Sequence, residues 1–536
     1  MTEIPPPADQ SPPAAAPAKR GGFARFLDGV EWLGNLLPHP VTLFALLAVG
    51  IVLLSGLFGY LGVAVEDPRP AGAPNVAEDG MIRAVSLMNG DGVRRIFTGL
   101  VDNFTSFAPL GVVLVAMLGV GVAEKSGLLS AAVRSMVLGA PPKLVTVAIV
   151  FAGIISNTAS EVGYVVLIPL GGAIYYALGR HPLAGMAAAF AGVSGGYSAN
   201  LLIGTVDPLL AGITQEAAQL IDPDYRVLAT ANWYFMAAST FLITIIGSAV
   251  SIYIVEPQLG RYDGTKADRG VLDEGMMQPL RAAERRGLRW AGIAMLGVFG
   301  VMALTLWPDW GVLRNAETGE RMDSPFFDGF VVWILVFFVV LGYAYGRAAG
   351  TMKSDRDVIE AMSEALGSLG LYIVLVFFAA QFVAFFGWTN LGGITAVTGA
   401  NFLVETGLTG PAMFFAFIVI CAIINLSLGS ASAQWAVTAP IFVPMLMLIG
   451  YSPEVIQAAY RIGDSTTNII TPMMSYFGLI LAWATRYQRD LGVGTLIAMM
   501  LPYSMAFLAA WSVFFYLWTF VTGLPVGPGS PTYYAG

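Results

Sequence analysis

Four charged side chains lie within otherwise apolar stretches of the sequence: Glu161, Asp207, Arg461 and Asp464. A charge is expensive at membrane depth, so a charged residue kept there is a candidate functional group. Arg461 and Asp464 are three residues apart and would share one helical face. They could form a self-neutralising structural pair. Alternatively, the planar guanidinium of Arg461 could hold a substrate carboxylate while Asp464 serves a coupling cation.

Backbone oxygens could complete a cation site near these charges. A proline has no N–H and crowds the carbonyl four residues back, so Pro208 is predicted to free the Gly204 carbonyl and Pro472 that of Asn468. Oxygen donors suit a hard cation such as Na⁺. The candidate donors are Asn157, Thr158 and Asn200 in the first half of the chain, and Asn425, Ser432, Asp464 and Asn468 in the second. Small polar residues also pack helices in membranes, so a structural role stays open for each.

Trp435 lies three residues after Ser432, inside a polar interruption of an apolar run. An indole at that place could stack on an aromatic substrate. It could equally fill the pocket without contacting a substrate.

The composition indicates the class of protein. Of 536 residues, 56% are hydrophobic and 12% charged, and the mean hydropathy is +0.72. Soluble domains carry about twice that share of charge, so we expect an integral membrane protein in a lipid bilayer. The net charge of −8 and the pI of 4.9 disfavour nucleic acid as a partner. Cys421, His39 and His181 are too few for an internal disulfide or a Cys/His zinc site.

The expected fold is all-α, with nine transmembrane helices and two re-entrant hairpins. Spanning the hydrocarbon takes about 20 apolar residues. Such runs occur at roughly 38–62, 103–123, 230–255, 289–307, 327–346 and 491–521, and interrupted runs at roughly 183–216, 358–387 and 454–486. The apolar stretches 144–178 and 411–450 each have a polar, small-residue break, SNTAS and NLSLGSASAQ, which predicts a hairpin.

Lysine and arginine predict the orientation. The loop at 256–289 holds thirteen charged side chains, which places it in the cytoplasm. We expect a multi-pass protein of the cell inner membrane, with a cytoplasmic N-terminus and a periplasmic C-terminus. The predicted divisions are a disordered Pro/Ala-rich tail (1–25), a first half (26–255), a cytoplasmic loop (256–288), a second half (289–521) and an outer tail (522–536).

The two halves resemble each other. A helix, a hairpin, a broken helix and a helix occupy 103–255, and the same series runs through 358–521 in the opposite orientation. IISN at 154–157 echoes IIN at 423–425, and SANLLI at 198–203 echoes TTNIIT at 466–471. Inverted repeats with paired broken helices are typical of secondary transporters.

Four long motifs make the chain similar to the AbgT (aminobenzoyl-glutamate transporter) family, over nearly all residues from about 25 onward. They are SNTASEVGYVVLIPL, AGVSGGYSANLLIGTVDPLLAGITQEAA, GSASAQWAVTAPIFVPM and YRIGDSTTNIITPMMSYF. The resemblance implies a homodimer with nine spans and two hairpins per subunit. It also implies uptake of p-aminobenzoyl-glutamate or export of sulfonamide-type antimetabolites.

The resemblance also implies roles for single residues. The substrate-pathway positions would be Asp207 in TVDP, Ser432 and Trp435 in SAQW, Pro453, Arg461 and Asp464 in RIGD, and Pro472 in ITP. Asn425 and Asp464 are similar to cation-site residues of the family. We expect no organic cofactor, and Na⁺ as the candidate bound ion.

Three function classes compete. The first is a secondary transporter of an aromatic carboxylate coupled to Na⁺ or H⁺. No G-x-x-x-x-G-K-[ST] loop occurs, which disfavours ATP as the energy source. An intramembrane hydrolase is disfavoured because both histidines lie away from Ser160 and Ser432, and no HExxH or GxSxG occurs. A passive channel for small anions is the third class.

Overall fold

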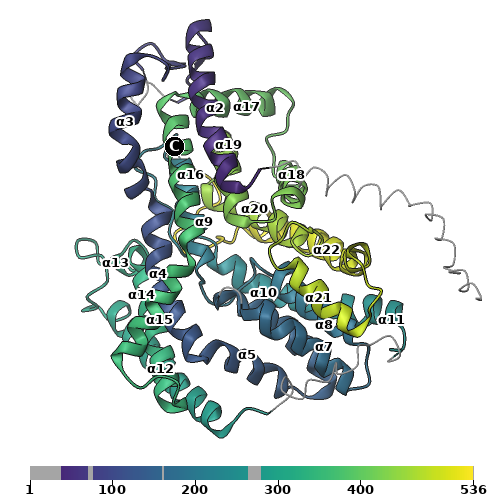
Figure 1. Cartoon of the computed structure of the whole chain (residues 1–536). Coiled ribbons are helices and arrows are strands. Elements are labelled where there is room, and N and C mark those ends of the chain that lie inside the picture. Colours follow the sequence, from purple (N-terminus) through teal and green to yellow (C-terminus); the bar gives the residue numbers. More distant parts are fainter. Residues whose placement is uncertain (1–37, 70–76, 160–161, 264–278, 535–536) are drawn as a thin grey trace, which may run out of the picture.

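The computed structural model describes residues 38–69, 77–159, 162–263 and 279–534 (Figure 1). The predicted Pro/Ala-rich tail, Glu161 and residues 264–278 of the predicted cytoplasmic loop lie outside these ranges. The described chain is almost entirely helical, which confirms the predicted fold class. One two-stranded antiparallel sheet was not expected, and it pairs β1 (Ala64–Glu66) with β2 (Met81–Arg83).

Eight helical segments of the described chain are long and apolar enough to cross a membrane. They contain α2 (Pro40–Leu61), α3 (Gly90–Thr105) with α4 (Ala108–Ser126), α10 (Trp233–Val250) with α11 (Glu256–Leu259), α12 (Ala282–Leu306), α14 (Phe330–Ala349), α16 (Gly370–Trp388), α19 (Ala431–Leu448) and α22 (Val493–Tyr516). Large apolar side chains are exposed along several of them, as expected for surfaces that face lipid.

Two predicted spans are broken helices in the structure. The first consists of α8 (Pro182–Phe190), a π-helical turn Ala191–Gly195, and α9 (Val206–Ala218), and the second of α20 (Pro453–Thr467) and α21 (Phe477–Tyr487). Since α19 is the second leg of a hairpin, the other seven long segments and these two broken helices match the nine predicted spans.

Both predicted hairpins are present. The first joins α6 (Val145–Ser156) to α7 (Ile168–Ala177) through the SNTAS stretch, and the second joins α18 (Met413–Leu428) to α19. Gly429 turns the second tip with φ +58, and a Cβ there would lie 2.8 Å from the Met473 carbonyl carbon. The second tip therefore lies directly against the break that follows α20.

Two short helices were missed in the sequence. α5 (Leu128–Leu138) precedes the first hairpin and α17 (Leu391–Glu405) precedes the second. Figure 1 shows them at opposite ends of the molecule, as an inverted repeat requires. The interrupted run at 358–387 divides into α15 (Asp355–Ser368) and α16.

The buried apolar residues form two main clusters. The larger cluster joins the hairpins, the broken helices, α10 and α22, and the smaller joins α4, α5, α12 and α14. Segment 524–534 crosses one end of the larger cluster: Phe235 N–H donates to Val526 O, Ser452 N–H to Thr532 O, and Ser530 Oγ to Ala231 O. This segment thus connects the start of α10 with the start of α20.

Candidate functional site

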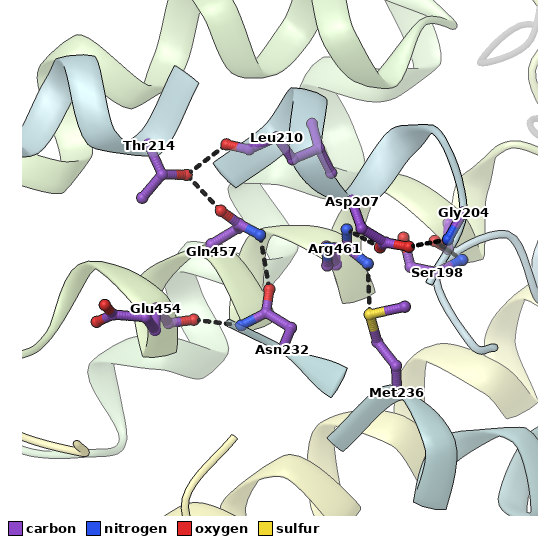
Figure 2. Close-up of polar contacts among 11 residues, drawn as sticks. Ser198, Gly204, Asp207, Leu210, Thr214, Asn232, Met236, Glu454, Gln457 and Arg461 are labelled. Carbon is purple, nitrogen blue, oxygen red and sulfur yellow. Dashed lines mark hydrogen bonds and ion pairs between the residues drawn. The ribbon is translucent and has the colours of Figure 1, made fainter. Parts of the chain in front are cut away.

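A buried ion pair joins the two broken helices (Figure 2). Arg461 Nη2 in α20 lies 2.5 Å from Asp207 Oδ1 in the first turn of α9, and the two side chains are 3% and 7% exposed. The other Asp207 oxygen accepts the Gly204 N–H at 2.7 Å, and Arg461 Nη1 donates to Met236 Sδ at 2.8 Å. The direct Arg461–Asp464 pair considered from their spacing is therefore wrong, because the arginine pairs across the repeats.

Asp464 carries oxygens without partners. Neither carboxylate oxygen accepts a well-formed hydrogen bond from the described residues, although Asn468 and Tyr460 lie near enough to interact. Asn425 Nδ2 donates to the Asp464 backbone oxygen at 2.8 Å and to Asn468 Oδ1 at 2.8 Å. Asn425 Oδ1 has no hydrogen-bond partner in the part of the chain that the structure describes. Buried oxygens without donors favour a cation, so this set fits Na⁺.

The first repeat has a smaller counterpart. Thr158 Oγ1 donates to Asn200 Oδ1 at 2.9 Å, while Asn157 Nδ2 makes a long contact of 3.5 Å with Gly153 O. Asn157 Oδ1 has no partner within the described ranges. The described residues of this first set include no carboxylate.

The prolines act differently from the prediction. Pro208 lies in the first turn of α9, where an N–H would have no helical acceptor, and Gly204 precedes the helix. Pro472 lies beyond the end of α20 at Thr467, and Pro453 is its first residue after the Ser452 cap. Pro208 and Pro472 therefore mark where helices begin and end, and neither frees a carbonyl inside a helix.

A cavity of about 270 Å³ lies between the two repeats. The first repeat contributes Asn157, Tyr164, Tyr197, Thr205, Val206 and Leu209, and the second contributes residues 429–432, Asn468 and 474–476. Ser432, Asn157 and Asn468 line this cavity, whereas Asn200 and Asn425 do not. Val206 of the lining directly precedes Asp207 of the buried ion pair, although neither Asp207 nor Arg461 is itself a lining residue.

Two larger cavities lie along different faces of α9. One, of about 500 Å³, shares Thr205, Val206 and Leu209 with the central cavity and extends to Lys125 and Glu364. Lys125 Nζ lies 2.6 Å from Glu364 Oε2, and both side chains are half exposed. The other, of about 510 Å³, is lined by Pro208, Ala211, Gly212 and Gln215 and extends to loop 223–229. α9 therefore separates two cavities of similar size.

Trp435 lies outside the lining of the central cavity. Its indole is fully buried and stacks on Tyr460, with ring centroids 4.2 Å apart and planes inclined by 20°. Its Nε1 donates to Thr214 Oγ1 at 2.8 Å. Stacking of a substrate on this ring stays a prediction, and in this conformation Tyr460 already covers one face.

A chain of hydrogen bonds continues from Trp435 through Thr214, and Figure 2 shows its part from Thr214 to Glu454. Thr214 Oγ1 lies within donating distance of Gln457 Oε1 at 2.5 Å and of Leu210 O at 2.8 Å. Gln457 Nε2 donates to Asn232 Oδ1 at 2.8 Å, and Asn232 Nδ2 to the Glu454 backbone oxygen at 2.8 Å. We call Trp435, Thr214, Gln457 and Asn232 the clamp, because their hydrogen bonds connect the two repeats. Trp435 and Gln457 belong to the second repeat, and Thr214 and Asn232 belong to the first. All four are at most 2% exposed.

Sequence reasoning missed Thr214, Asn232 and Gln457, although one signal was present. Glu454, Gln457, Arg461, Asp464 and Asn468 recur at intervals of three and four, the spacing of one helical face. Every residue of α20 is buried, so this polar face lies inside the protein. The Glu454 carboxylate accepts the Tyr225 hydroxyl at 3.0 Å.

Comparison with known proteins agrees with this architecture. The family described as "AbgT putative transporter family" matches residues 25–534. The chain belongs to the AbgT family. This AbgT-family chain is 36% identical over 500 residues to the p-aminobenzoyl-glutamate transport protein of Escherichia coli K12, covering 93% of the chain and 95% of that relative.

Two solved structures are similar over nearly the whole AbgT-family chain. MtrF of Neisseria gonorrhoeae, described within a class of antimetabolite efflux pumps, superposes with a TM-score of 0.89 at 59% identity, over 95% of this chain and all of that one. The YdaH transporter of Alcanivorax borkumensis, described as having an unusual topology, gives 0.84 at 45% identity, over 92% of this chain and all of that one. The relatives are transporters, so the protein is a multi-pass membrane transporter and not an enzyme.

Proposed function

We propose that this protein is an ion-coupled secondary transporter of p-aminobenzoyl-glutamate and related aromatic carboxylates, including sulfonamide antimetabolites. One observation carries the proposal: a cavity lined by both repeats includes Val206, the residue before Asp207 of the buried Arg461–Asp207 pair. Guanidinium groups recognise carboxylates through two parallel hydrogen bonds. A substrate carboxylate would compete with Asp207 for Arg461 and thereby separate the two broken helices.

The substrate range rests on the relatives. A p-aminobenzoyl-glutamate transport protein is 36% identical, and MtrF, described within a class of antimetabolite efflux pumps, is 59% identical. The higher identity to MtrF supports including antimetabolites among the substrates.

The coupling ion is proposed to be Na⁺, held by Asp464 and Asn425. Their three unpaired oxygens offer a negative site about one helical turn from the ion pair on α20. Asn468 and the first-repeat set Asn157, Thr158 and Asn200 offer a second, uncharged group of oxygens. Protons are the alternative coupling ion, because protonation of Asp207 would release Arg461 without any bound metal.

The transport cycle is proposed to be alternating access. Two cavities of similar volume on different faces of α9 support it, since a small movement of α9 could close one and open the other. The positive-inside rule places Lys125 at the cytoplasmic mouth of the first cavity and loop 223–229 at the outer mouth of the second. A homodimer in the inner membrane, with its N-terminus in the cytoplasm and its C-terminus in the periplasm, completes the proposal.

Flux in proteoliposomes tests the proposal. Purified protein is reconstituted, and radiolabelled p-aminobenzoyl-glutamate flux is measured with Na⁺ and pH gradients imposed separately, in both directions. We expect saturable flux that follows one of the two gradients. Flux without saturation at zero gradient would instead indicate a passive channel, and absence of flux for every aromatic carboxylate would refute the substrate class.

A further inference from the structure

We propose that a stacked pair of tyrosines, Tyr164 and Tyr476, recognises the aromatic ring of the substrate, in place of Trp435. The inference rests on the proposed function. It assigns selectivity for aromatic substrates to these two tyrosines and not to Trp435. The two rings have centroids 4.6 Å apart and planes inclined by only 8°. Both residues line the central cavity.

The two rings come from different repeats. Tyr164 lies in a π-helical turn, Gly163–Leu167, directly after the first hairpin tip. Tyr476 lies between α20 and α21, directly before Phe477. The stack therefore bridges the repeats at the cavity wall, and a ligand bound to it would contact both repeats at once.

Trp435 is the competing aromatic candidate, and its surroundings disfavour it. The indole is 0% exposed, is stacked on Tyr460, and has its N–H committed to Thr214. Binding a substrate ring there would require breaking the clamp. The tyrosine pair already forms part of the wall of the central cavity, whereas Trp435 does not.

The physical chemistry of aromatic groups supports the same choice. In a face-to-face pair, each ring covers one face of the other. Tyr164 is only 6% exposed and Tyr476 is half-buried, so a substrate ring would approach the pair from the cavity side of Tyr476. The same cavity carries amide and hydroxyl groups from Asn157, Ser432 and Asn468, which suit the polar half of an aminobenzoyl amino acid. Its volume of about 270 Å³ is close to the lower end of small-molecule pockets, about 300 Å³.

Ligand selectivity tests the proposal. Affinities of p-aminobenzoyl-glutamate and of N-acetyl-glutamate, which lacks the ring, are measured on wild type, Tyr476→Leu and Tyr164→Leu in detergent. We expect each leucine variant to bind the aromatic ligand about threefold to tenfold more weakly, the worth of one ring-to-ring contact. N-acetyl-glutamate affinity should stay within about twofold, and Tyr476→Phe should resemble wild type.

Phe514→Leu is the matched control, because Phe514 stacks on Phe235 at 5.6 Å and 19° outside the lining of the cavity. It should leave the affinity ratio of the two ligands unchanged. An unchanged ratio in both tyrosine variants, with binding intact in wild type, overturns the inference while leaving the proposed function standing. A selectivity change in Trp435→Phe alone also overturns it. Failure of wild type to bind the aromatic ligand overturns both.

Discussion

Thr214→Val should open the clamp and shift the proposed alternating-access equilibrium toward the conformation that opens to the outside. The Thr214 hydroxyl accepts from Trp435 Nε1 at 2.8 Å, and its one hydrogen is shared between Gln457 Oε1 at 2.5 Å and Leu210 O at 2.8 Å. Valine can neither accept nor donate these bonds. Each buried hydrogen bond contributes about 0.5–1.5 kcal/mol net. Losing the bonds to Trp435 and Gln457 therefore destabilises the closed conformation by about 1–3 kcal/mol, or about fivefold to hundredfold in the conformational equilibrium.

Cysteine labelling measures this shift. The chain has a single cysteine, Cys421, which is buried, so Cys421→Ser with Ser475→Cys places one thiol in the lining of the central cavity. A membrane-impermeant maleimide added from the outside should label this thiol at least about fivefold faster once Thr214→Val is added.

Thr240→Val is the control for the labelling experiment. Thr240 is equally buried, but its hydroxyl donates within α10, to Met236 O at 3.1 Å. It should leave the labelling rate unchanged. The reasoning is refuted if Thr214→Val labels at the parent rate, or if Thr240→Val accelerates labelling to the same extent.

Three further perturbations have defined outcomes. Arg461→Lys keeps the charge but loses the planar two-nitrogen contact, so p-aminobenzoyl-glutamate flux in proteoliposomes should fall by about tenfold or more while the protein still folds. Asp464→Asn removes the charge of the proposed Na⁺ site, so a Na⁺ titration of substrate binding should flatten. Gly429→Ala puts a Cβ against Met473 at a left-handed φ, and the strain of about 1–2 kcal/mol should lower the Tm in detergent, whereas Gly111→Ala, with open space around it, should not.

Each of these expectations can fail on its own. Normal flux through correctly inserted Arg461→Lys protein would leave Arg461 only a structural partner of Asp207. A wild-type Na⁺ response in Asp464→Asn would remove that carboxylate from coupling and favour a proton at Asp207. Equal Tm values for the two glycine variants would mean that the tip of the second hairpin is not tightly packed.

The hairpins and most spans could be predicted because local hydrophobicity reports them. A polar break in an apolar run has few structural explanations at membrane depth, and both were found near the predicted limits. α5 and α17, with 11 and 15 residues, are too short to be recognised as spans. α19 stays helical through Pro440 and Pro444, which local rules would not predict.

The sequence indicated several residues of the candidate site, such as Asp207 and Arg461, but not how they pair. One alternative drawn from local spacing paired Arg461 with Asp464, whereas the ion pair joins residues 254 positions apart. The same applies to Trp435 and Thr214, which are 221 positions apart. Such contacts depend on how the two repeats lie against each other, and helical periodicity contains no information about that.

Segment 524–534 determines which parts of the protein can move. It hydrogen-bonds to Ala231 and Phe235 at the start of α10 and to Gly450 and Ser452 at the start of α20. Gly527 lies so close to Ala231 that a Cβ would be 2.1 Å from its carbonyl oxygen, so even a methyl group would push the segment away. One helix from each repeat is thus tied to the other at the same end. This tie favours movement of α10 and α20 together over a swing of the two repeats as independent halves.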